Sequence, residues 1–113
     1  MKHLLLLIAV LTFPIAAKAE DKKITTAEHI TQAGPYFPPE MQARKMSGKV
    51  TISMDIDKTG RTMNCKIVSS SDPGFNASAL DYCKVQRYVP AFVNGKLAVE
   101  HNHKQTLAYS PGQ

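Results

Sequence analysis

Apolar and polar residues alternate most clearly in the middle of the chain, over residues 49–57. The apolar positions there are Val50, Ile52, Met54 and Ile56. This period of two is typical of a strand that buries one face. Lys58-Thr59-Gly60 follows as a turn, in which glycine takes a positive φ at little cost. The alternation resumes at Met63, Cys65 and Ile67. The pattern therefore predicts a β-hairpin over residues 49–69 with Cys65 on its apolar face.

A short helix is predicted before the hairpin. Prolines hold the chain extended up to Pro39, and proline is favoured at the first position of a helix. We expect one or two helical turns over residues 41–46, ended by Ser47-Gly48.

A second helix is predicted after the hairpin, over residues 76–87, with Asn76 or Ser78 as its N-cap. Ala79, Leu80 and Cys83 fall on one face of this helix. Cys83 therefore points toward the core, as Cys65 does, and the two sulfurs can meet only if the helix packs on the hairpin.

The C-terminal third of the chain is predicted to be extended. An Asn94-Gly95 turn separates residues 88–92 from a long strand over Leu97–Tyr109. In a regular strand His101 and His103 share one face and Glu100 lies on the other. The order helix, strand, strand, helix, strand predicts an α+β fold, a small antiparallel three-stranded sheet packed by two short helices.

The N-terminus has the form of a secretory signal. Met1-Lys2-His3 is basic, Leu4–Phe13 is apolar, and Ala17-Lys18-Ala19 is a cleavage site of small residues. The apolar run is too short to span a membrane, which takes roughly 20 residues. We therefore expect a signal peptide over residues 1–19 and a location in the periplasm, with an uncleaved inner-membrane tether as the alternative. A polar lead-in (20–34), one domain (35–109) and a tail (110–113) then follow.

The net charge argues against one class of function, and the cysteine content indicates a disulfide. The chain carries 14 basic and 9 acidic residues. Loss of Lys2 and Lys18 leaves 12 against 9, a formal charge of +3, which is too small to indicate nucleic-acid binding. In an exported chain the two cysteines, Cys65 and Cys83, favour a structural disulfide over free or redox-active thiols.

Several short motifs resemble the C-terminal domain of TonB-type energy-transducing proteins. They are Phe37-Pro38, Gly48-Lys49-Val50, Ile56-Asp57-Lys58-Thr59-Gly60, Val68-Ser69-Ser70, Phe75-Asn76-Ala77-Ser78-Ala79-Leu80, Arg87-Tyr88-Val89-Pro90-Ala91 and Val93-Asn94-Gly95-Lys96. Their order and spacing cover residues 36–109. The resemblance assigns structural roles to Phe37, Pro38, Gly48, Val50, Gly60, Leu80, Arg87, Tyr88, Pro90 and Ala91.

The resemblance implies protein binding by strand addition. In that family the small sheet receives an extra strand from an outer-membrane receptor. The corresponding edge in this chain is Val99, Glu100, His101, Asn102, His103, Lys104 and Gln105. Polar residues there suit an exposed edge, and homodimerisation through the same edge is equally accessible.

Two departures from the family bear on energy coupling. A transducing member has an uncleaved anchor and a long proline-rich spacer, whereas Glu20 to Tyr36 spans at most about 55 Å here. Gln86 also replaces the family's tryptophan. We expect a stand-alone binding module, with a tethered short transducer as the alternative.

A third interpretation is a secreted, disulfide-stabilised enzyme or metal protein. His101 and His103 would need a third ligand to hold zinc, and Ser69-Ser70-Ser71 has no His/Asp partner in the sequence pattern. Arg87 is expected to satisfy helix-end carbonyls rather than to hold a partner's carboxylate. We therefore predict no catalytic residue, metal, cofactor, small-molecule substrate or nucleic acid.

Overall fold

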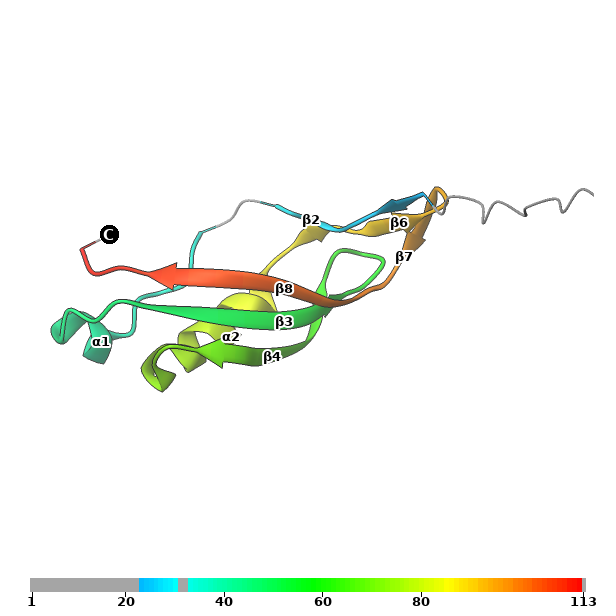
Figure 1. The fold of residues 1–113 in the computed structure, drawn as a ribbon. Helices are drawn as coiled ribbons and strands as arrows, with labels where there is room; N and C mark the ends of the chain where they lie inside the picture. The colour runs from blue at the N-terminus through cyan, green and yellow to red at the C-terminus, as the bar shows by residue number, and fades with distance from the viewer. Residues whose placement is uncertain (1–22, 31–32, 113) are drawn as a thin grey trace, which may run out of the picture.

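The computed structural model describes residues 23–30 and 33–112 (Figure 1). The predicted signal peptide lies outside the described residues. The elements are β1 (Ile24–Thr25), β2 (Glu28–His29), α1 (Pro39–Ala43), β3 (Gly48–Ile56), β4 (Thr62–Ser70), the 3-10 turn η1 (Pro73–Phe75), α2 (Asn76–Val85), β5 (Tyr88–Val89), β6 (Ala91–Val93), β7 (Lys96–Ala98) and β8 (Glu100–Tyr109).

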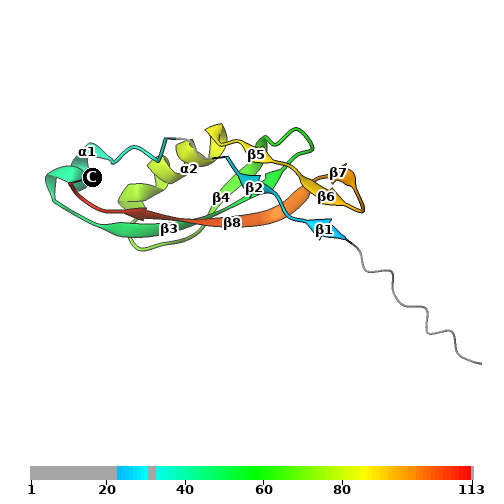
Figure 2. The same ribbon diagram turned by 90° about the horizontal axis from the view of Figure 1, so that it is seen from above.

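The main sheet has the strand order β4-β3-β8, with both pairs antiparallel. It confirms the predicted α+β fold and the hairpin. The view from above shows α2 and the short β2–β5 pair on the same side of this sheet (Figure 2). The sheet therefore has one covered face, which holds the core, and one outer face.

The core forms where β3 meets α2. Val50, Ile52, Met54 and Ile56 are at most 1% exposed, as their alternation predicts. They lie among Phe75, Ala79 and Cys83, all fully buried. A disulfide joins Cys65 of β4 to Cys83 of α2, with Cα atoms 6.1 Å apart, which confirms the predicted packing of the helix on the hairpin.

The predicted face of Met63 is wrong because β4 contains a bulge. Asn64 has a φ of 55° and adds a residue between the pairs Asp55–Met63 and Ser53–Lys66. The extra residue moves Met63 to the outer face, where it is 39% exposed. Cys65 stays on the core face.

The predicted long strand over Leu97–Tyr109 is two strands. β7 pairs with β6 and β8 pairs with β3, so the chain changes partner at Val99. The predicted turn before it is confirmed, because Asn94 and Gly95 have φ values of 52° and 78°, as a tight hairpin turn requires.

The first helix begins at Pro39, as predicted, but it ends at Ala43, earlier than expected. Arg44 is the C-cap, and Lys45 then takes a left-handed φ of 51°. The chain has therefore already left the helix before Ser47-Gly48 is reached.

The predicted caps of the second helix are wrong. Asp72 caps the preceding 3-10 turn instead, since its side chain accepts a hydrogen bond from the Gly74 N–H at 2.8 Å. The hydroxyl of Ser78 is directed away from the helix end and donates to the Tyr36 carbonyl. The helix also ends at Val85, because Gln86 is extended.

The polar lead-in contributes two short strands. β1 pairs with β6, and β2 pairs with β5. Ala27 between them is 6% exposed and belongs to the core. Within residues 23–30 and 33–112, no helix is long and apolar enough to cross a membrane.

Candidate binding surface along strand β8

Strand β8 forms one edge of the main sheet. It pairs with β3 from Glu100 to Tyr109, and in the described part of the chain no strand lies on its other side. The predicted binding residues Glu100 to Gln105 belong to this edge strand, and Val99 precedes it. Unpaired backbone N–H and C=O groups along such an edge are a template for a further strand.

The predicted faces of the histidines and Glu100 are wrong because β8 also contains a bulge. Asn102 has a φ of 57°, and the register shifts between the pairs Met54–His103 and Ile56–Glu100. Glu100 and His103 therefore share the core-side face, where His103 Nδ1 contacts Glu100 Oε2. His101 does not share this face. Its side chain is 70% exposed, and its Nδ1 lies 3.5 Å from Asp55 Oδ2.

The covered face beneath the edge strand carries polar side chains that the sequence does not place there. Gln105 lies opposite the buried Ile52 and so faces the core side, contrary to the expectation of an exposed residue. Its Oε1 accepts from the Tyr88 hydroxyl at 2.8 Å, and its Nε2 donates to the Tyr82 hydroxyl at 3.2 Å. Burial raises the pKa of Tyr88 to about 12, so this hydroxyl remains a donor at neutral pH.

The N-terminal strand β2 is tied into the same polar network. His29 Nε2 lies 2.7 Å from Gln86 Oε1, and its ring centroid is 5.0 Å from that of Tyr88. The Ala27 N–H donates to Glu100 Oε1 at 2.7 Å. Gln86, which stands where the resembling family has tryptophan, is only 2% exposed and has this histidine as its partner. Sequence reasoning missed the pairing because residues 29 and 86 meet only through tertiary folding.

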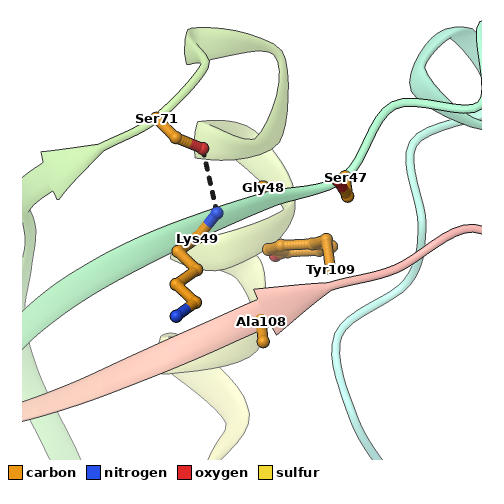
Figure 3. A pocket seen from close by; sticks show the side chains of 6 residues that line it. All are labelled: Ser47, Gly48, Lys49, Ser71, Ala108 and Tyr109. Carbon is orange, nitrogen blue, oxygen red and sulfur yellow. Dashed lines mark hydrogen bonds between the residues drawn. The ribbon is translucent and has the colours of Figure 1, made fainter.

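An open hollow of about 350 Å³ lies at the C-terminal end of β8 (Figure 3). Its lining is Ser47, Gly48, Lys49, Ser71, Ala108 and Tyr109. The Lys49 N–H donates to Ser71 Oγ at 2.9 Å, which fixes the loop after β4 against the start of β3. Any residue larger than glycine at position 48 would clash with the core, because its Cβ would lie 2.5 Å from the Phe75 ring.

The residues to which the family resemblance assigns structural roles pack within the domain. The Phe37 ring packs edge-on against Phe75 and Tyr109, with centroids 5.6 and 6.0 Å away. Gly60 has a φ of 87° and lies against the Tyr88 carbonyl, where a Cβ would overlap the oxygen. Burial raises the pKa of Tyr109 as well. Arg87 makes only a long 3.5 Å contact from Nη1 to the carbonyl of Gln86.

Across residues 23–30 and 33–112, no three His, Cys, Asp or Glu side chains lie together as metal ligands. His101 and His103 are separated by the bulge and each has its own carboxylate, Asp55 and Glu100.

The fold is a small α+β domain whose sheet leaves the edge strand β8 unpaired on one side in the described part of the chain. The chain belongs to the family described as "Gram-negative bacterial TonB protein C-terminal", whose model matches residues 33–111. Domains of this family are periplasmic, non-enzymatic interaction domains that are associated with TonB-dependent transport and with binding to outer-membrane receptors.

Solved structures agree with this fold. The solution NMR structure of the Pseudomonas aeruginosa TonB C-terminal domain is similar with a TM-score of 0.63 and 18% identity, over 79% of this chain and 90% of that chain. A structure of the TonB2 protein from Vibrio anguillarum gives 0.59 and 25% identity, over 78% of this chain and 84% of that chain. No curated protein matches the sequence.

Proposed function

We propose that this chain is a periplasmic binding module that takes up an extended segment of a partner protein as an added strand along β8. The observation that carries the proposal is that β8 is paired on one side only in the described part of the chain; β4 is the opposite edge strand, and the crosslinking experiment below compares the two. Backbone hydrogen bonds along the edge would supply affinity, and flanking side chains would supply selectivity. The hollow at Gly48 and Ala108 lies where one end of the added strand would reach.

The partner we propose is the periplasmic segment of an outer-membrane receptor. Its support is membership of a family that binds such receptors. The alternative partner for the same edge is a second copy of this chain. The mass of the crosslinked adduct, described below, distinguishes a receptor from a second copy.

We further propose that the module acts without energy coupling of its own. Cleavage between Ala19 and Glu20 would remove the apolar run that a transducing protein needs as its anchor. Intact-mass analysis of the periplasmic protein tests this: a mature N-terminus at Glu20 is expected. Retention of residues 4–17 in a membrane fraction would instead support the tethered transducer.

Site-specific photo-crosslinking in the exporting bacterium tests the edge itself. Lys66 and Lys104 make a matched pair of positions, since both are exposed and both lie opposite Ser53, one on β4 and the other on β8. We expect a photoreactive residue at Lys104 to capture a receptor and the same residue at Lys66 to capture none. Equal capture at both positions would contradict strand addition at β8, and an adduct of twice the chain's mass would show a homodimer instead.

A further inference from the structure

Arg61 and Arg87 lie directly opposite each other in an antiparallel bridge. The Tyr88 N–H donates to the Gly60 carbonyl at 2.9 Å, immediately beside this pair. That bond places the two arginines at a non-hydrogen-bonded position, where opposite side chains approach most closely. The backbone thus holds the Cα and Cβ atoms of the two arginines side by side.

The surrounding residues fix the pair in this arrangement. The Asp57 N–H donates to the Arg61 carbonyl at 2.9 Å, which closes the turn on one side. Gln86 and Tyr88, on either side of Arg87, are each 2% exposed. The alternation of an extended segment therefore directs the Arg87 side chain away from the buried network.

In the part of the chain that the structure describes, neither arginine side chain forms a salt bridge with a carboxylate. Asp57, in the same turn as Arg61, accepts from the Thr59 N–H at 2.8 Å and the Arg61 N–H at 3.0 Å. Hydrogen bonds, of which the one from the Thr59 hydroxyl has the largest effect, hold the pKa of Asp57 below its usual range. Asp57 is therefore ionised at neutral pH. Like charges directly opposite each other destabilise a strand pair, and Asp57 offsets only one of the two.

We propose that Arg61 and Arg87 form a docking site for a carboxylate side chain of a protein partner. Guanidinium groups bind carboxylates through paired N–H donors, and two of them can hold one carboxylate between them. Lys58 lies in the same turn as Asp57 and Arg61, so the site keeps a net positive charge with Asp57 ionised. Because the chain belongs to a family of protein-interaction domains, the anion we propose is the carboxylate of an acidic protein segment, and the test below compares it with phosphate.

The site is separate from the β8 edge. Ile56 pairs with Thr62 on one side and with Glu100 on the other, so Arg61 lies about 10 Å, two strand spacings, from the start of β8. The proposal does not rest on strand addition, because neither arginine belongs to β8. Variants of the arginine pair therefore test this site and not the edge.

NMR titration of the purified chain tests the site, with the arginine Nε–H signals as the readout. The probes are acetyl-Gly-Glu-Gly-amide, its glutamine counterpart and inorganic phosphate. We expect the glutamate peptide to shift the Arg61 and Arg87 signals saturably, and the glutamine peptide to leave them unchanged. Arg61→Gln or Arg87→Gln should each weaken the response at least about tenfold. Arg44→Gln, at an exposed arginine on the C-cap of α1, should leave it unchanged.

Arg87→Glu gives a second, ligand-free measurement. The new carboxylate lies opposite Arg61, while Arg61 stays beside Asp57, so repulsion becomes attraction and the melting temperature should rise by about 1–3 °C. The same variant should no longer respond to the glutamate peptide. A fall in melting temperature, an equal response to the glutamine peptide, a loss of response in Arg44→Gln, or tighter binding of phosphate than of the glutamate peptide would each overturn the proposal.

Discussion

Asp55 accepts a hydrogen bond from the backbone N–H of Asn102 at 2.9 Å, and this bond spans the bulge of β8. The same carboxylate accepts from Asn64 Nδ2 at 2.8 Å, and Asn64 is the bulge residue of β4. One side chain of the central strand thus fixes a bulge in each neighbouring strand at the same level of the sheet. The bulges in turn decide which side chains of β4 and β8 face the core.

Loss of this carboxylate should loosen both bulges. Asp55→Ala leaves the Asn102 N–H without its acceptor, so we expect faster amide exchange at Asn102 and Asn64 and a lower melting temperature. Asp81→Ala is the control, because that carboxylate contacts only the exposed Tyr36 hydroxyl, at 3.2 Å. Unchanged exchange in Asp55→Ala would show that the backbone holds the bulges alone.

Stability should fall in acid through Asp55 and Asp57. Hydrogen bonds, chiefly from the Asn64 and Thr59 side chains respectively, hold the pKa of each carboxyl below its ordinary value of 3.8. A lowered folded-state pKa contributes stability above the unfolded-state pKa, and that contribution disappears as the pH falls through the folded-state pKa. Denaturant unfolding between about pH 5 and pH 2 measures it. The Asp55→Asn/Asp57→Asn double variant should show a flatter acid limb, and a limb as steep as that of the wild type would contradict the assignment.

The disulfide should contribute a large part of the stability. It closes a loop of 18 residues between β4 and α2, and the chain-entropy model gives about 3 kcal/mol for such a loop. Urea unfolding of Cys65→Ala/Cys83→Ala should show a loss of at least this size, since Cys83 is fully buried. Addition of reductant should destabilise the wild type and leave the double variant unchanged. Free alkylation of the native protein without reductant would contradict the bond.

Gly60 should tolerate alanine less well than Gly95. Both have a positive φ, 87° and 78°, where a Cβ costs about 1–2 kcal/mol. At Gly95 the new Cβ meets open space, whereas at Gly60 it overlaps the Tyr88 carbonyl oxygen. The excess loss in Gly60→Ala over Gly95→Ala, measured by urea unfolding, reports this contact. Equal losses would show that the turn moves away from β5 at little cost.

Alkaline pH should destabilise the domain through Tyr88. Burial raises its pKa from 10.0 to about 12. The sign follows from linkage: the contribution is complete below pH 10 and is lost as the pH rises through about 12. Tyrosinate absorbance should show a group titrating near pH 12 that is absent in Tyr88→Phe, while the raised Tyr109 remains in both proteins. If the variant titrates like the wild type, the late group is another tyrosine, such as Tyr109.

The sequence determined the elements whose signals are local. The alternation of β3, the turn at Gly60, the Asn94-Gly95 turn and the proline start of α1 all follow from side-chain period or backbone preference over a few residues. The disulfide also follows, since both cysteines fall on faces that must be buried. The edge position of the last strand came from motifs whose order and spacing define a family.

Tertiary structure decided how the faces of β4 and β8 are occupied. Asn64 and Asn102 readily adopt a left-handed φ, but an asparagine alone does not place a bulge, because a bulge depends on the partner strand. The faces of Met63, Glu100 and His103 therefore follow only from the paired sheet. The same holds for contacts between distant segments, such as His29 with Gln86 and Arg61 with Arg87. Pattern and period fix which residues are extended or helical, while register between strands, set by the packing of the whole domain, fixes which of them meet.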